Sequence, residues 1–299
     1  MQSRSVEVDG PVHFADFGGS GPTMVLVHGL GGSHANWAAV GPTLAARARV
    51  LAPDLAGFGR TPLVGRSATV QANRRLLDRF LDAVSDGPAI LVGNSMGGLI
   101  ALLEAARRPG KVAGLVLVGP AQPRPRRTLV DPIVGLTFAA YALPGIGECV
   151  LRWRAARLGP ERLVHRTLSL CCADVTRVAP EMIAAHVALA RERQAMPWAH
   201  AAFLQAARSI IGLLARRRHL AKVIASVRAP TLVVQGTEDR LVPLAASRAT
   251  VARRPDWSLA VFEGIGHVPQ LEAPERFIET VVSWLAATRG ATAGAVGAG

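Results

Sequence analysis

The chain has 299 residues, of which 50% are hydrophobic and 18% are charged, a composition typical of a globular protein and not of a disordered one. Arginine and lysine outnumber aspartate and glutamate by 34 to 21, which gives a formal net charge of +13. Such a charge is compatible with an acidic partner or an anionic membrane surface. Because only two of the cations are lysines, codon usage explains it better. No nucleic-acid-binding module is recognisable, so we expect no nucleic-acid partner.

Sequence motifs for metals and nucleotides are missing. The chain has no C-x-x-C, no H-E-x-x-H and no Walker-type loop, so we expect no metal and no cofactor. Cys149, Cys171 and Cys172 do not form a disulfide framework. The first residues lack the apolar segment of a signal peptide, and no apolar run approaches the roughly 20 residues of a membrane span. We therefore expect a cytoplasmic protein, and nothing in the sequence indicates its oligomeric state.

Strand and helix patterns alternate through residues 1–120. Two short strands around Asp9-Gly10 predict a hairpin, and "TMVLVHG" is the continuous apolar run of a strand buried on both faces. Further along, helices are predicted at 36–48, 68–84 and after Ser95, and strands at 49–53, 89–93 and 112–118. Strands separated by helices of this length imply right-handed crossovers and a mainly parallel sheet.

From residue 121 to residue 223 the alternation stops, and helical patterns follow one another without a clear strand. Strand and helix patterns resume over 224–288, ending with a helix at 274–288. We therefore predict a core formed by residues 1–120 and 224–288, with 121–223 inserted as a helical cap. Residues 289–299, "RGATAGAVGAG", are expected to form a flexible tail.

Ser95 occupies the centre of Gly93-Asn94-Ser95-Met96-Gly97, a G-x-S-x-G match between a buried strand and a helix. Such a turn strains the backbone of the central residue and lifts its side chain clear of the sheet. The flanking glycines are needed because a Cβ there would clash with a neighbouring element. The hydroxyl lies at a helix N-terminus, where developing negative charge is stabilised. Ser95 is therefore the candidate nucleophile.

A serine hydroxyl needs a base to take its proton, and His267 is the best candidate among eight histidines. It directly follows the last predicted strand, at the edge of the sheet where ligands bind. His13 and His28 lie at or inside strands and are expected to be structural. His34 lies close to the expected cleft and is a candidate substrate contact. His165, His186, His200 and His219 belong to the insertion and match no catalytic signature.

Asp239, at the end of the preceding strand, is the candidate carboxylate that orients the base. A turn-capping aspartate would explain the same residue, but the order Ser, Asp, His favours a catalytic triad. The backbone N–H groups of Met96 and of Leu30, in "HGLGGSHANW", are the candidate oxyanion donors.

These motifs resemble the consecutive signatures of the α/β-hydrolase fold superfamily. The similarity rests on "VLVHGLGG", "LAPDLAGFGRT", "LVGNSMGGLIAL", "PTLVVQGTEDRLVP" and "GIGHVPQLEAPERF", and covers about residues 5–120 and 225–288. It implies an α/β protein with an eight-stranded, mainly parallel sheet flanked by helices, and a serine hydrolase mechanism. The fold alone does not name the substrate.

Among hydrolases of this superfamily, those with an aspartate nucleophile are excluded by Ser95, and Tyr141 is the only tyrosine available for epoxide opening. Hydrolases of carbon–carbon bonds stay open, because "GNSMGG" resembles their motif and the cap arginines Arg191 and Arg193 could bind a dicarboxylate, although a solvated helix face would also explain these arginines. Those enzymes usually carry tryptophan after the histidine, where this chain has Val268, itself a candidate substrate contact. A non-catalytic ligand-binding protein is a further alternative, although the triad is complete.

The cleavage of small-molecule carboxylic esters with small to medium acyl chains is the hypothesis that requires the fewest further assumptions about substrate-binding residues. An apolar acyl chain fits the insertion, where residues 131–153 are rich in Leu, Ile, Val and Ala. This stretch could pack on the core, or could rest on a lipid surface with Arg152, Arg154 and Arg157 at its edge. We expect core packing, because Pro144 and Gly145 interrupt any longer amphipathic helix.

Overall fold

Eight strands form one sheet in the order β1-β2-β4-β3-β5-β6-β7-β8 in the computed structural model, which describes residues 1–296. Strand β2 runs antiparallel to both of its neighbours, and all other neighbouring strands are parallel. This arrangement confirms the predicted eight-stranded, mainly parallel sheet. The strands are β1 Gln2–Glu7, β2 Pro11–Gly18, β3 Thr23–Val27, β4 Arg49–Pro53, β5 Ala89–Asn94, β6 Val112–Val118, β7 Thr231–Gly236 and β8 Ser258–Phe262.

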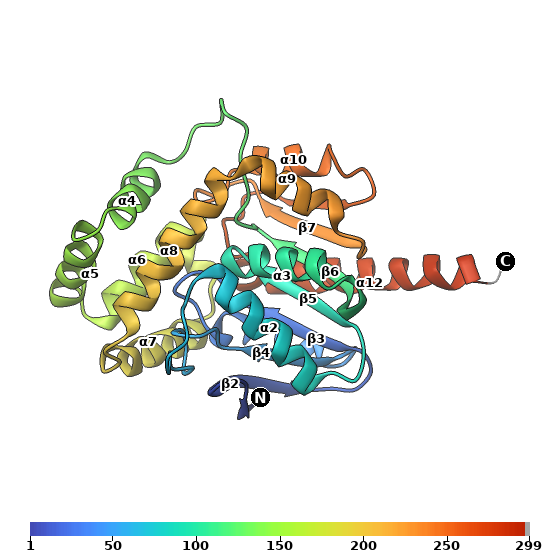
Figure 1. Ribbon diagram of the computed structural model, residues 1–299, viewed down its shortest axis with the longest axis horizontal. Coiled ribbons are helices and arrows are strands. Elements are labelled where there is room, and N and C mark those ends of the chain that lie inside the picture. Colours follow the sequence, from blue (N-terminus) through green and yellow to red (C-terminus); the bar gives the residue numbers. More distant parts are fainter. Residues whose placement is uncertain (297–299) are drawn as a thin grey trace.

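Helices cover both faces of the sheet, and a second group of helices forms a separate layer at one end (Figure 1). The helices along the sheet are α1 Gly41–Leu44, α2 Val70–Val84, α3 Met96–Arg107, α9 Arg217–Ser226, α10 Leu244–Val251, α11 Pro269–Glu272 and α12 Pro274–Val296. The insertion contributes α4 Pro132–Ala142, α5 Ile146–Arg157, α6 Pro160–Cys171, α7 Pro180–Gln194 and α8 Ala199–Ala215. Short 3-10 turns are η1 His34–Trp37, η2 Pro109–Lys111 and η3 Val175–Arg177.

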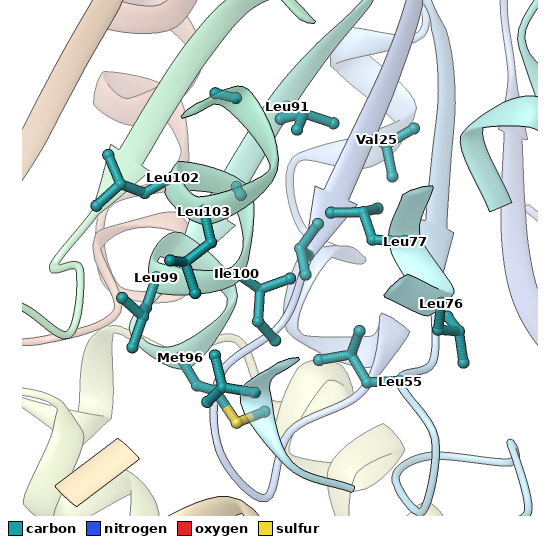
Figure 2. Packing of buried hydrophobic residues seen from close by; sticks show 14 of the residues in the cluster. Val25, Leu55, Leu76, Leu77, Leu91, Met96, Leu99, Ile100, Leu102 and Leu103 are labelled. Atoms are coloured by element: carbon teal, nitrogen blue, oxygen red, sulfur yellow. The ribbon is translucent and has the colours of Figure 1, made fainter. Parts of the chain in front are cut away.

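Successive strand residues point to opposite faces of the sheet, and in this protein the side chains on both faces are apolar and buried. Val25 and Leu91 belong to the core cluster that also holds Leu77 of α2 and Ile100 of α3, and Figure 2 shows these side chains between the helices and the sheet. The residues before them in β3 and β5 belong to the opposite cluster, together with side chains of α1 and α12. Continuous apolar strands therefore supply both halves of the core.

The helix predicted over 36–48 is the first point where the structure differs. Two short pieces, η1 and α1, replace it, and α1 has Pro42 in its first turn. Proline lacks the N–H that a continuing helix needs, and its ring clashes with the carbonyl four residues earlier. The chain therefore restarts a helix at this point and does not extend one through it.

Residues 289–296, the first part of the expected flexible tail, continue α12 as a helix. Alanine has the highest helix propensity, and extending an existing helix requires no new nucleus. Residues 297–299, the rest of the predicted tail, lie outside the described residues.

The predicted end of the insertion, residue 223, falls inside α9. Leu220 of α9 belongs to the same core cluster as the α3 side chains, and Val223 packs against that cluster. Helix α9 therefore lies with the sheet. The helices that form the separate layer are α4 to α7 and much of α8, and we use "cap" for them below.

The expectation that residues 131–153 pack on the core is wrong for about half of their large apolar side chains. Val134 and Tyr141 are buried, but Ile133, Leu136 and Trp153 are more than half exposed. Helices α4 and α5 pack against α8, α5 also contacts α6, and Figure 1 shows the pair on the far side of α8 from the sheet. The sides of the two helices that face away from these contacts are left to the solvent.

Candidate active site

Ser95 lies at the N-terminus of α3, directly after β5, with φ 55° and ψ −115°. This conformation is uncommon for a residue with a side chain, and the neighbouring glycines make it possible. A Cβ on Gly93 would lie 2.4 Å from the Gly97 carbonyl oxygen, and one on Gly97 would lie 2.1 Å from the Val27 oxygen. The turn is therefore as sharp as G-x-S-x-G predicts. The Ser95 side chain has no hydrogen-bond partner within the described residues and is only partly buried.

His267 and Asp239 form a buried pair at the carboxyl ends of the strands. Nδ1 of His267 donates a hydrogen bond to Asp239 Oδ2 over 2.7 Å. This bond places the proton on Nδ1 and leaves Nε2 unprotonated when the ring is neutral. A Cβ on Gly119, just after β6, would lie 3.0 Å from both Asp239 Oδ2 and His267 Nδ1. Because Ser95 N–H donates to the adjacent Val118 carbonyl, the three predicted triad residues all gather around the end of β6.

The hydrogen bonds of Asp239 fit both roles considered from the sequence, the capping of a turn and the orientation of the base. Its Oδ1 accepts from the backbone N–H groups of Leu241 (2.9 Å) and Val242 (2.8 Å), which caps the turn. Its Oδ2 accepts from His267 and, over 2.7 Å, from Gln235 Nε2. The turn-capping and base-orienting explanations are therefore compatible, because each uses a different oxygen.

A chain of buried hydrogen bonds extends from Asp239 away from the site. Thr250 Oγ1 donates to Gln122 Oε1 (2.7 Å), and Gln122 Nε2 donates to Ser247 Oγ (2.8 Å). Ser247 Oγ in turn donates to Gln235 Oε1 over 2.7 Å. Every donor points toward Asp239, so the chain fixes the Gln235 amide that supports the carboxylate. The sequence analysis missed these residues, although a glutamine inside the apolar strand "TLVVQG" was a visible signal.

Asn94 is a second positioning residue that the sequence analysis missed. Its Nδ2 donates to the Val118 carbonyl (3.0 Å) and to the His267 carbonyl (3.1 Å). The residue before the nucleophile therefore holds the loop of the base against the end of β6. Residues 94 and 267 are 173 positions apart, so no local pattern could have revealed this contact.

The loop after β3 lies against the nucleophile, as expected for an oxyanion site. A Cβ on Gly29 would lie 3.2 Å from Ser95 Cβ. The backbone N–H groups of Leu30 and Met96 have no acceptor in the described part of the chain. Met96 is the first residue of α3, where the helix dipole adds to its N–H. Both groups are therefore free to bind a developing oxyanion.

His28 braces this loop, in agreement with its predicted structural role. Nδ1 of the ring donates to the Gly29 carbonyl (2.8 Å), while Nε2 accepts from the Leu55 N–H (3.0 Å). Complete burial lowers the pKa of His28 to about 4, against the opposing attraction of Asp54. The imidazole is therefore neutral at pH 7, and the two bonds need that neutral form.

His34 does not stand free as a substrate contact; it belongs to a network around the buried Asp54. The Asp54 carboxylate accepts from His13 Nδ1 (2.8 Å), from His34 Nδ1 (3.0 Å) and from the backbone N–H groups of His34 and Arg60. Burial would raise the pKa of Asp54, but the bonds from the two histidines outweigh it and hold the pKa well below its usual range. His13, His34 and Asp54 lie close enough to hold a metal ion, but four donors already occupy the carboxylate.

The cap touches the loop of His267 directly. The His267 N–H donates to the Cys171 carbonyl over 2.5 Å. Glu272 accepts from the N–H groups of Gly266 (2.8 Å), Ala173 (3.2 Å) and Asp174 (2.9 Å). Val268, the predicted substrate contact, is buried in a cluster with Leu168 and other side chains of the cap. The loop that carries the base is thus held partly by the insertion.

Arg191, the predicted substrate contact, lies at the surface of the cap. Its side chain is 64% exposed and pairs with Glu161 on α6. The neighbouring Arg193 is the buried arginine of this helix. It donates to the carbonyls of Gly57 (3.0 Å) and Gly59 (3.2 Å) and lies over the Phe58 ring. The residue order along α7 explains the difference, because positions two apart on a helix face different directions.

An apolar wall adjoins the oxyanion loop. Phe203 of α8 lies 3.1 Å from the Cβ position of Gly31, and packs with Leu30, Tyr141 and Leu204. The arrangement combines a partly exposed hydroxyl, an oriented imidazole, two free N–H groups and an apolar surface. These are the parts that acyl transfer requires.

Residues 22–274 match the protein family described as the alpha/beta hydrolase fold. A curated relative from Aromatoleum aromaticum, pimeloyl-[acyl-carrier protein] methyl ester esterase, is 35% identical over 257 residues, which are 85% of this chain and 94% of that protein. A 2-hydroxy-6-oxononadienedioate/2-hydroxy-6-oxononatrienedioate hydrolase from Paraburkholderia xenovorans is 27% identical, over 95% of this chain and 94% of that protein. The solved structure of a thermophilic esterase from Thermogutta terrifontis is 26% identical with a TM-score of 0.71, covering 96% of this chain and 99% of that one.

Proposed function

Because this chain belongs to the α/β hydrolase fold family and is a hydrolase, we propose that it cleaves carboxylic esters through an acyl-enzyme on Ser95. The observation that carries the proposal is the Asp239–His267 pair, 2.7 Å apart, at the end of β6 beside the strained Ser95 turn. The same geometry leaves His267 Nε2 free to accept the hydroxyl proton.

In the proposed reaction, Ser95 Oγ attacks the ester carbonyl carbon while His267 Nε2 takes the hydroxyl proton. The oxyanion that forms accepts hydrogen bonds from the N–H groups of Leu30 and Met96. The bond between carbon and the alcohol oxygen then breaks, and the leaving oxygen takes the proton from His267. A water molecule, deprotonated by His267, attacks the acyl-enzyme, and the acid leaves as Ser95 regains its proton. Asp239 stabilises the imidazolium in both halves.

The partly buried side chains of Leu30 and Phe203, beside the oxyanion loop, support an acyl group that is itself apolar. The similarity to a methyl ester esterase at 35% identity supports a small alcohol as the leaving group. We therefore propose a small-molecule ester with a small to medium acyl chain.

Cleavage of carbon–carbon bonds is the second candidate, and the observation in its favour is the 27% identity to a hydrolase of that type. Its substrate there carries two carboxylates, which an arginine could bind. Arg191 and Arg193 are already engaged, one with Glu161 and the other with backbone carbonyls. The ester reaction therefore has the stronger support.

The proposal is tested by hydrolysis of p-nitrophenyl esters from acetate to palmitate. We expect activity that peaks at one chain length and that falls by about four orders of magnitude or more in Ser95→Ala, since nucleophile removal has effects of this size elsewhere. His267→Ala should behave similarly, and Asp239→Asn somewhat less severely. Ser169→Ala, an exposed serine on α6, is the matched control and should keep the wild-type rate.

The two candidates and the non-catalytic alternative give different outcomes. Near wild-type turnover in folded Ser95→Ala would refute the assignment of the nucleophile. No ester hydrolysis, with Ser95 still labelled by a fluorophosphonate and mapped by mass spectrometry, would favour carbon–carbon cleavage or another acyl substrate. A folded wild-type protein that neither turns over nor takes the label would favour ligand binding.

A further inference from the structure

Large apolar side chains are exposed together on one segment of the cap. Leu129, which precedes α4, is 90% exposed, and Leu136 in α4 is 75% exposed. Outside this segment, only Met1 and Val64 are large hydrophobic side chains with comparable exposure within the described residues. We use "apolar face" for the exposed hydrophobic side chains of this segment. They are Leu129, Ile133, Leu136, Leu143, Ile146 and Trp153.

Helical geometry groups the members of this set that lie within the helices. At about 100° per residue, Ile133 and Leu136 lie about 60° apart around the α4 axis, and Leu143 follows the end of that helix. On α5, the same spacing groups Ile146 with Trp153. Cys149 and Ala156, both exposed, continue that strip. The exposed side of α4 is therefore apolar, and that of α5 is an apolar strip with arginines beside it.

The opposite sides of α4 and α5 are fixed to the protein, so the apolar face cannot turn inward without breaking contacts. Tyr141 is buried against Leu204 and Phe203 of α8. Arg208 of α8 donates to the Tyr141 carbonyl (2.9 Å) and pairs with Glu148 over 3.0 Å. These contacts hold the two helices with the apolar face outward.

Positive charge accompanies the apolar face. Between residues 124 and 166 the chain has eight arginines and only three acidic residues. Each of the three acids pairs with an arginine from another segment: Asp131 with Arg240, Glu148 with Arg208, and Glu161 with Arg191. The local arginines therefore keep their charge uncompensated by neighbouring acids.

Two of these arginines flank the apolar strip of α5. By helical spacing, Arg152 lies on one side of Ile146 and Trp153, and Arg157 lies on the other. Both are exposed, and neither has an acidic partner within the described residues. Exposed arginines beside exposed apolar side chains allow one surface to contact both the acyl region and the phosphates of a membrane.

The hydropathy of the segment agrees with a surface location. No single helix among the described residues is long and apolar enough to cross a membrane. Helices α4 and α5 meet the length and composition test only when taken together, and they are bent by 116° at their junction. Because of this bend, α4 and α5 can both contact a membrane surface without crossing the membrane.

We propose that the apolar face with Arg152 and Arg157 docks this protein on an anionic lipid membrane. The apolar side chains would enter the acyl boundary, and the arginines would meet the lipid phosphates. A second copy of the chain is the weaker occupant, because its equivalent face would bring the same arginines against these ones. This proposal is independent of the chemistry at Ser95.

Co-sedimentation with lipid vesicles tests the proposal on the full chain. We expect the wild type to bind vesicles of equal parts phosphatidylcholine and phosphatidylglycerol at least about tenfold better than phosphatidylcholine alone at low salt. Leu136→Asp should weaken binding by at least about tenfold, as should Arg152→Gln combined with Arg157→Gln. Val64→Asp, at an exposed apolar residue distant in the sequence, is the matched control and should bind as the wild type does.

Tryptophan fluorescence is a second test, and it needs no substitution of an apolar side chain by a charged one. The fluorescence of Trp153 should shift to shorter wavelength when anionic vesicles are added, and Trp153→Phe should lose that shift. Failure of the wild type to sediment with anionic vesicles would overturn the proposal. So would equal binding by Leu136→Asp, or a self-associated species that Leu136→Asp abolishes without any vesicle binding.

Discussion

At the residue scale, several side chains act through their protonation state. His28 is the clearest case, because one ring nitrogen donates to Gly29 and the other accepts from Leu55. A protonated ring would have two donors and would lose the bond from the Leu55 N–H. The neutral ring thus holds the candidate oxyanion loop after β3 against β4.

This arrangement predicts a loss of stability in acid. With a pKa of about 4 in the folded state and 6.5 unfolded, the unfolded chain binds the extra proton between these values. Stability is therefore complete above about pH 6.5 and falls by about 3 kcal/mol as the pH drops to 4. Urea unfolding across this range should show that decline in the wild type and a smaller one in His28→Gln.

His219→Gln is the control, because His219 is exposed on α9. It should follow the wild-type pH dependence. If His28→Gln lost the same free energy between pH 6.5 and pH 4 as the wild type, His28 would not be the source of the decline.

Ser247 offers a second test at this scale, because it joins two glutamines in the buried chain that ends at Asp239. Ser247→Ala leaves Gln235 Oε1 and Gln122 Nε2 without this partner. We expect the free energy of unfolding to fall by about 1–3 kcal/mol. We also expect kcat to fall with KM unchanged, since Asp239 would keep its backbone bonds but lose a fixed Gln235.

Urea unfolding and ester kinetics would measure the two effects separately. Ser283→Ala, at an exposed position of α12, is the matched substitution and should change neither. A Ser247→Ala protein that is less stable but has the wild-type kcat would show that the chain supports the fold alone.

At the scale of elements, Glu272 connects three segments at the junction of α11 and α12. Its carboxylate accepts from Gly266 in the loop of the base and from Ala173 and Asp174 in the cap. The side chain is fully buried, so a neutral amide there would present a donor to N–H groups that need an acceptor. The cap and the loop of His267 are thus stabilised by one residue.

Glu272→Gln should therefore lower the free energy of unfolding by about 2 kcal/mol or more, because bonds to a charged acceptor are the strong ones. It should also lower kcat/KM, since the His267 loop would no longer be held to the cap. Thermal unfolding and ester hydrolysis would measure the two effects. Glu275→Gln, exposed in the first turn of α12, is the control, and equal behaviour of both variants would contradict this role.

At the scale of the whole molecule, burial is unevenly distributed. Helix α3 and strand β5 are enclosed on all sides, while α4 and α5 pack against α8 and α6 and leave several large side chains exposed. Helix α7 lies between these extremes, because Arg193 anchors it to the Gly57 and Gly59 carbonyls. Local opening needs less free energy where fewer contacts are broken.

Hydrogen exchange followed by mass spectrometry should reveal this gradient. Amides of α4 and α5 are expected to exchange at least about a hundredfold faster than those of β5 and α3, with α7 between them. Anionic vesicles should slow exchange in α4 and α5 if that face docks on lipid. Protection of α4 equal to that of α3 would contradict the structural ranking.

The family, the parallel sheet and the candidate triad could all be predicted from the amino-acid sequence. These depend on local patterns: apolar strands of five to eight residues, the glycines around Ser95, and polar residues at strand ends such as Asp239 and His267. Each of these features is set by backbone geometry within a few residues, so it is visible along the chain. The break at Pro42 was equally local and could have been predicted.

The residues that support the site, and those that face the solvent, became visible only in the folded protein. Asn94 reaches His267, Gln122 reaches Ser247 and Arg193 reaches Gly57, each across more than 100 residues. The exposure of Leu136 and the outward position of Arg191 were also invisible, because an apolar or charged residue does not specify its neighbours. Which side of a cap helix is buried depends on how helices pack, and that is settled only when the whole chain folds.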